Sequence, residues 1–210
     1  MRQALARQLA HPRGMTGWAV GKLMAVANRQ PTRLAIDALG LVAGQKVLDL
    51  GCGGGQAMAA MLDSPGRLEV HGIDRSARMV RDCARTNAKA IAAGLASVCE
   101  GQFEALPWAN ATFDRILASN VMYFWHDSRT VIGELRRVLK PGGRLVIYLT
   151  AAETMRKWNF AAARTHRLFA ADDVHAALVD GGFGAEEVEL RHLALPAGVS
   201  GLLAIAERHA

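Results

Sequence analysis

The 210-residue sequence has few cysteines, few aromatic residues and no long apolar run. Its three cysteines are an odd number without CxxC spacing, which argues against a disulfide framework and against a zinc site. No apolar run approaches the ~18 residues needed to span a bilayer, and the first residues lack an apolar stretch followed by a cleavage site. These absences predict a cytoplasmic protein with reduced thiols and no bound metal.

Positive charge is concentrated in residues 1–40, which hold six basic side chains against Asp37 alone. Such a segment could meet nucleic acid, an anionic membrane surface or an acidic substrate. Six charges over forty residues do not form a dense run, however, and a solvated helix face explains them as well. The length is that of one ordinary domain with at most a short extension.

The remaining chain alternates short apolar runs with longer amphipathic ones, which is typical of a parallel sheet covered by helices on both faces. The expected strands are 46–50, 67–73, 96–100, 113–119 and 144–150, followed by 185–193 and 202–208. The expected helices are 56–62, 77–93, 128–139, 153–167 and 171–179. A short connection separates the last two strands, so they should pair antiparallel at a sheet edge. The pattern predicts an α/β fold with three layers, Rossmann-like, around a seven-stranded, mostly parallel sheet with an antiparallel C-terminal hairpin.

The first expected strand ends in Asp49 and runs into the glycine-rich sequence GCGGG at 51–55. Glycines let a backbone approach a ligand closely, and ligands of open α/β sheets bind at the carboxyl ends of the strands. A dinucleotide site of the GxGxxG type is the competing interpretation, although Gln56 stands at its third glycine position. The second strand ends in Asp74, whose carboxylate could accept both hydroxyls of a ribose or, alternatively, cap the next helix.

Four motifs follow one another along the chain: LDLGCGGG at 48–55, GID at 72–74, EALPW at 104–108 with FDRILASN at 113–120, and LKPGGRL at 139–145. The last two distinguish between a dinucleotide site and the alternative considered next. In this order the chain resembles a class I S-adenosylmethionine-dependent methyltransferase, of the small-molecule group (methyltransferase type 11) that includes the ubiquinone and menaquinone carbon methyltransferases. The resemblance covers residues 46–150, and a nicotinamide enzyme does not predict the last two elements.

The resemblance implies a site for S-adenosylmethionine, with S-adenosylhomocysteine as product. The implied contacts are Asp49, Gly51, Cys52, Gly53, Asp74, Arg75, Met79, Gln102, Phe103 and Asn120. Asp49 and the loop would face the methionine end together with Asn120. Asp74 would hold the ribose and Arg75 would flank the adenine. Gln102 stands where many relatives carry an aspartate that contacts the adenine amino group, and its amide oxygen could accept there.

Methyl transfer from a sulfonium is an in-line displacement, so alignment and exclusion of water are its main requirements. If the acceptor loses a proton, His126 is the candidate base and Tyr123 a positioning donor. A polar helix start is the alternative for His126, and core packing is the alternative for Tyr123. Cys52 has no adjacent histidine, so we expect its side chain to be structural rather than nucleophilic.

The relatives also suggest how the site is covered. The resemblance implies that residues 1–40 are a helical lid on a domain at 41–210, and the aromatic-rich segment 154–169 is a second lid candidate. These segments favour an apolar or planar small-molecule acceptor, methylated at carbon, nitrogen or oxygen. The alternatives are a cofactor-binding subunit or sensor without catalysis, and RNA methylation, which the sequence NVMY at 120–123 disfavours because it lacks the prolines of NPPY. A homodimer is possible, and nucleic acid is not an expected partner.

Overall fold

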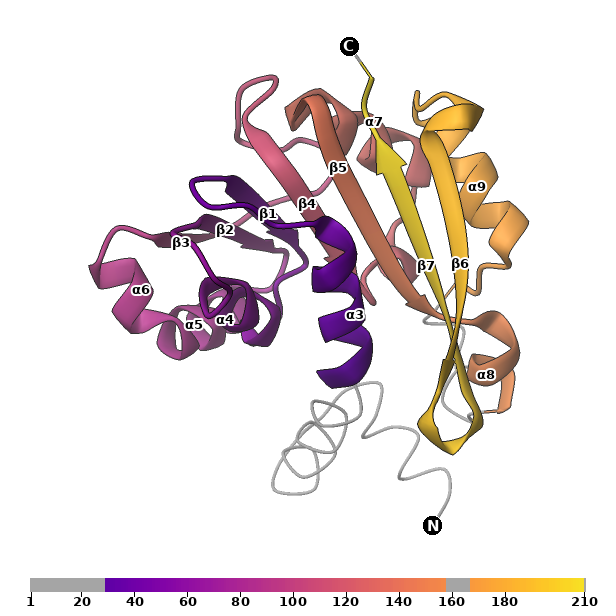
Figure 1. The fold of residues 1–210 in the computed structure, drawn as a ribbon, viewed down its shortest axis with the longest axis horizontal. Coiled ribbons are helices and arrows are strands. Elements are labelled where there is room, and N and C mark those ends of the chain that lie inside the picture. Colours follow the sequence, from indigo (N-terminus) through magenta and orange to yellow (C-terminus); the bar gives the residue numbers. More distant parts are fainter. Residues whose placement is uncertain (1–28, 158–166, 210) are drawn as a thin grey trace.

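The computed structural model describes residues 29–157 and 167–209, which build one seven-stranded sheet between layers of helices (Figure 1). The strand order is β3-β2-β1-β4-β5-β7-β6. The strands are β1 (Lys46–Leu50), β2 (Glu69–Asp74), β3 (Ala96–Glu100), β4 (Phe113–Ser119), β5 (Leu139–Thr150), β6 (Val188–Leu195) and β7 (Val199–Glu207). β1 to β5 are parallel, while β7 runs antiparallel to both β5 and β6. The predicted fold class, with its hairpin at the sheet edge, is confirmed.

Helices cover both faces of the sheet, as Figure 1 shows. One face carries α3 (Arg29–Leu39), α4 (Gln56–Leu62) and α5 (Ala77–Thr86), with α6 (Ala88–Ala92) beyond α5. The other face carries α7 (Ser128–Val138) and α9 (Ala171–Asp180). The short elements are α8 (Ala152–Lys157) and the 3-10 turns η1 (Met122–Phe124), η3 (Ala185–Glu187) and η4 (Pro196–Gly198). Because β1 lies between β2 and β4, the order of connections reverses there, and this is where open α/β sheets bind ligands.

The expected helix 77–93 is wrong as a single element, because it breaks at Asn87 into α5 and α6. The Asn87 side-chain amide donates to the carbonyls of Gly55 (3.1 Å) and Cys83 (3.0 Å). An asparagine that bonds to backbone carbonyls competes with regular helix, which explains the break. The same bond ties the helix pair to the glycine-rich loop.

Other boundaries move by a few residues. β5 begins at Leu139 rather than at 144, because Leu139 pairs with Phe113 of β4, and because Gly142 N donates to Arg208 O (2.7 Å) and Arg208 N to Gly143 O (3.0 Å). The hairpin begins at Val188 rather than at 185, since the residues before it form η3. β2 begins at Glu69 rather than at 67.

The helix α3 is packed directly on the sheet. Ala35 and Leu39 are fully buried, and the helix end is fixed by Arg115 Nε, which donates to Leu39 O at 2.8 Å, and by Arg144, which donates to Ala38 O at 2.8 Å. The rest of the predicted first lid, residues 1–28, lies outside the described residues, as does 158–166 of the second. Within the described part of the chain, no helix is long and apolar enough to cross a membrane.

Candidate active site

The loop 51–55 turns the chain sharply at the end of β1. Gly51 N and Cys52 N both donate to Ile73 O, at 2.8 and 3.1 Å, so the loop folds over the end of β2. Gly51 has φ 74° and Gly53 has φ 51°, both in the left-handed region that favours glycine. A Cβ on Gly51 would lie 2.4 Å from Val121 Cγ2, whereas a Cβ on Gly53 would meet nothing nearer than 4.0 Å. The loop is therefore closed against the protein at Gly51 and open at Gly53.

The junction of α5 and α6 holds the other side of the loop. Thr86 Oγ1 donates to Gly54 O at 2.7 Å, beside the Asn87 bond to Gly55 O. A Cβ on Gly55 would lie 2.4 Å from the Asn87 amide nitrogen, so only glycine fits there. These contacts fix the loop without using its open side.

Asp74 lies at the carboxyl end of β2, directly beside the loop. Its Oδ2 accepts from Gly53 N at 3.0 Å and its Oδ1 accepts from Ser76 N at 2.9 Å. Ser76 rather than Asp74 is the N-cap of α5, since Ser76 Oγ accepts from Met79 N. A carboxylate has about four acceptor positions, so both oxygens of Asp74 retain capacity for a ligand.

Asp49 is a buried carboxylate beneath the same loop. It is 2% exposed, and its Oδ2 is buried with no hydrogen-bond partner among the described residues. Burial, together with the nearby charge of Asp74, raises the pKa of Asp49 from 3.8 to about 7. A cationic group bound beside Asp49 would favour its ionised form, so this acid fits a ligand with a positive charge.

Cys52 points away from the open side of the loop. Its Sγ would lie 3.0 Å from a Cβ built on Gly72, beneath the loop on the α4 and α5 side of the sheet. A hydrogen bond with Cys83, together with burial, raises the pKa of the Cys52 thiol well above its ordinary value. The thiol therefore stays protonated, in keeping with a structural rather than a nucleophilic side chain.

The segment after β3 lies beside Asp74. Gly101 N donates to Asp74 O at 3.1 Å, and the next residues are the exposed Gln102 and the buried Phe103. Arg75 forms an ion pair with Glu104 through both carboxylate oxygens. The structure thus places Gln102 and Phe103 next to the end of β2, and directs Arg75 toward the segment that carries them, while their contacts with a ligand stay a prediction.

The end of β4 lies at the same edge of the sheet as the glycine-rich loop, because β4 pairs with β1. Asn120 has φ 53°, and its backbone N donates to Tyr148 O at 2.8 Å. The Tyr123 hydroxyl lies 3.2 Å from Asn120 Oδ1 and 3.1 Å from Thr150 O. Burial raises the pKa of Tyr123, so its hydroxyl is a neutral group that fixes Asn120 and the end of β5.

His126 is exposed at the start of α7. It directly precedes Asp127, the N-cap residue, whose carboxylate accepts from Thr130 N at 3.2 Å. Its place near a helix start fits the structural alternative, and its assignment as a base stays a prediction.

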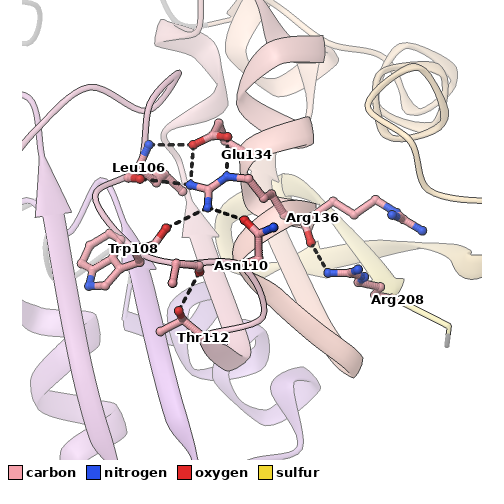
Figure 2. Close-up of polar contacts among 9 residues, drawn as sticks. Leu106, Trp108, Asn110, Thr112, Glu134, Arg136 and Arg208 are labelled. Atoms are coloured by element: carbon pink, nitrogen blue, oxygen red, sulfur yellow. Dashed lines mark hydrogen bonds and ion pairs between the residues drawn. The ribbon is translucent and has the colours of Figure 1, made fainter.

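A clamp that the motifs alone did not reveal holds the 104–112 loop (Figure 2). Arg137 donates to Leu106 O (3.0 Å), Trp108 O (2.8 Å) and Asn110 Oδ1 (2.9 Å), and it pairs with Glu134 through Nε (2.7 Å) and Nη2 (2.8 Å). Glu134 also accepts from Leu106 N at 2.8 Å. The signal in the sequence is a glutamate and an arginine three residues apart on α7, a spacing that places them on one helix face.

The close approach at Gly51 predicts that Gly51→Ala destabilises the fold by about 1–3 kcal/mol more than Gly44→Ala. Gly44 is the matched control, because its φ is 82° but a Cβ there would meet nothing within 4 Å. Urea denaturation of the two variants measures the difference. Equal free energies of unfolding would show that the contact with Val121 imposes no constraint.

The raised pKa of Asp49 predicts a pH-dependent gain of stability in Asp49→Asn. The folded carboxyl holds its proton up to about pH 7 and the unfolded one releases it near 3.8, so between these values only the unfolded state ionises and the stability of the wild type falls as the pH rises. A rise from 3.8 to about 7 corresponds to a cost of up to ~4 kcal/mol above pH 7. Denaturant titrations should show the advantage of the variant over the wild type growing from pH 5 to pH 8. An advantage independent of pH would contradict the assignment.

Comparison with known proteins agrees with this geometry. Residues 48–147 match the family described as "Methyltransferase domain". The chain is 30% identical over 134 residues to the uncharacterized methyltransferase YdaC of Bacillus subtilis, covering 63% of this chain and 71% of that protein. It is 32% identical to O-methyltransferase resE of Aspergillus sclerotiorum, covering 70% of this chain and 55% of resE. It is also 32% identical to demethylmenaquinone methyltransferase of Renibacterium salmoninarum, covering 57% of this chain.

The matched region is about half of some relatives, since it spans 55% of resE and 47% of the demethylmenaquinone enzyme. Among solved structures, geranyl diphosphate methyltransferase in complex with S-adenosylmethionine superposes with a TM-score of 0.72 at 17% identity. The superposition covers 96% of this chain and 94% of that one, which establishes a common fold. By motifs, fold and sequence similarity, the chain belongs to the class I S-adenosylmethionine-dependent methyltransferases.

Proposed function

We propose that this chain transfers a methyl group from S-adenosylmethionine to a small, apolar or planar acceptor. The observation that carries the proposal is the buried Asp49 carboxylate, one oxygen of which has no hydrogen-bond partner among the described residues, beneath an open glycine loop and with Asp74 at the end of the neighbouring strand. The cofactor has a cationic amino-acid end and a ribose with two hydroxyls. The two acids offer a charge partner for the first and hydrogen-bond acceptors for the second.

In this proposal each strand end holds one part of the cofactor. Asp49 and the loop with Gly51 and Gly53 bind the methionine portion, together with Asn120, which directly follows β4. Asp74 accepts from the ribose hydroxyls. The adenine lies against the segment of Gln102 and Phe103, which the Gly101 bond to Asp74 O keeps next to the ribose carboxylate.

The bound cofactor supplies a methyl group on a sulfonium, which needs no further activation. The contribution of the protein is to hold donor and acceptor in line and to exclude water. Tyr123 serves as a positioning residue, because its hydroxyl stays protonated and engages both Asn120 and Thr150. Where the acceptor loses a proton, His126 takes it as general base, which would require the exposed imidazole to turn toward the acceptor.

The acceptor class is proposed from the apolar residues after β4 and at the ends of the second lid candidate. Phe124 is 48% exposed beside Tyr123, and its ring lies 6.3 Å from that of Tyr123. Met155 and Phe169 lie at the described ends of the second lid candidate and are buried in the hydrophobic cluster that also contains Tyr123. Since the relatives include proteins named for O-methylation and for a menaquinone precursor, the methylated atom is not set by the fold. The lid at residues 1–40 and a homodimer remain predictions.

Titration calorimetry with S-adenosylhomocysteine tests the cofactor assignment. We expect wild-type binding, and we expect Asp74→Ala to weaken it by roughly 1–3 kcal/mol, because ribose hydroxyls lose their acceptor. Asp63→Ala is the control, since Asp63 is an exposed acid at the end of α4. An absence of binding at millimolar ligand would refute the proposal, and unchanged affinity in Asp74→Ala would refute the role of that residue.

Turnover is tested separately, by release of S-adenosylhomocysteine on a panel of phenols, quinols and prenyl alcohols. Methylation of at least one acceptor supports the proposed function. Cofactor binding without turnover on any of them favours a non-catalytic subunit or sensor.

A further inference from the structure

Arg75 follows one segment of the proposed cofactor site and contacts two others. It directly follows Asp74 at the end of β2. Its guanidinium pairs with both oxygens of Glu104, lies with its carbon 4.6 Å from the centre of the Phe103 ring, and approaches Phe124 O at 3.5 Å. The Arg75 side chain thus connects the end of β2, the segment after β3 and the turn after β4.

The Arg75–Glu104 pair is sheltered rather than fully exposed. The side chains of Arg75 and Glu104 are 25% and 28% exposed, and Arg75 Nε is buried with no hydrogen-bond partner among the described residues. Although partial burial opposes it, the hydrogen bond from Arg75 lowers the pKa of Glu104, which therefore stays ionised. The contact is a charge-assisted hydrogen bond from one terminal nitrogen, Nη2, to both carboxylate oxygens, and it ties the two side chains together.

The contacts of Arg75 leave its guanidinium engaged with protein on several sides. One face lies over Phe103, Nη2 holds Glu104 and Nη1 approaches Phe124 O, while Phe103 is itself 3% exposed within the core. These contacts engage one face of the guanidinium and both of its terminal nitrogens with protein.

We propose that Arg75 is a positioning residue, which shapes the adenosine half of the site through Phe103 and Glu104 without touching the cofactor. The inference rests on the proposed function and departs from the flanking contact that the family resemblance implies. It makes Glu104 an equal partner, although Glu104 is two residues beyond Gln102 and has no assigned contact with the ligand.

The two roles differ in how substitutions combine. If Arg75 acts through Glu104, then removal of either partner releases the same segment, and the second removal adds little. If Arg75 instead touches the adenine, Glu104→Gln should have a small effect, and the two effects should add.

The experiment is a double-mutant cycle on the full chain, with binding measured by calorimetry. The variants are Arg75→Met, Glu104→Gln and the double variant, and the ligands are S-adenosylhomocysteine and 5′-methylthioadenosine, which lacks the amino-acid portion. We expect each single variant to weaken both ligands by about tenfold, and the double variant to be no weaker than either. Arg78→Met is the control, because Arg78 is an exposed arginine three residues further on, in α5, and its pair with Asp82 is 3.8 Å long.

Hydrogen exchange provides a readout that loss of global stability would not reproduce. Exchange in residues 101–106 should rise in both single variants, while that in β1 and β4 stays unchanged. Arg75→Lys keeps the charge but loses the planar group over Phe103 and the second nitrogen that approaches Phe124 O, so it should fold as the wild type does and still lose affinity for both ligands.

Additive effects, or full affinity in Glu104→Gln, would overturn the inference. Wild-type protein that binds neither ligand would instead refute the proposed function, so the two failures are distinguishable.

Discussion

The site depends on the two hydrogen bonds that Gly51 and Cys52 donate to the Ile73 carbonyl. They turn the chain across the end of β2 as it leaves β1, and so they bring Gly53 N onto the carboxylate of Asp74. The same turn covers Asp49 and leaves it without a hydrogen-bond partner for one oxygen among the described residues. An unpaired buried acid costs folding free energy, and ligand charge can offset that cost.

Around this turn, the protein fixes each neighbouring segment from outside the site. Asn87 and Thr86 hold the loop from behind, and the Glu134–Arg137 clamp holds the segment that follows Phe103 (Figure 2). The groups that face the proposed cofactor are therefore positioned before it binds. Preorganisation of this kind is what an in-line displacement requires, since alignment of donor and acceptor accounts for much of the rate.

The sequence predicts the fold closely where local pattern determines the structure. The bounds of β1, β3, β4 and α4 agree with those expected, because apolar runs and glycines mark them. The break at Asn87 and the early start of β5 could not be predicted, since they depend on bonds to Gly55 and Arg208 from distant parts of the chain. In the site, motifs locate the strand ends, whereas the direction of the Arg75 side chain depends on Glu104, 29 residues away.

The central claim is that the glycine turn and the buried Asp49 form the binding site for the cationic amino-acid end of the cofactor. The most direct measurement is the number of protons released when S-adenosylhomocysteine binds at pH 7, from calorimetry in buffers of different ionisation enthalpy. With the pKa of Asp49 at about 7 in the free protein, a bound ammonium should lower it and release a fraction of a proton, and Asp49→Asn should abolish the release. Binding heats that are independent of the buffer, or proton uptake, would contradict the account.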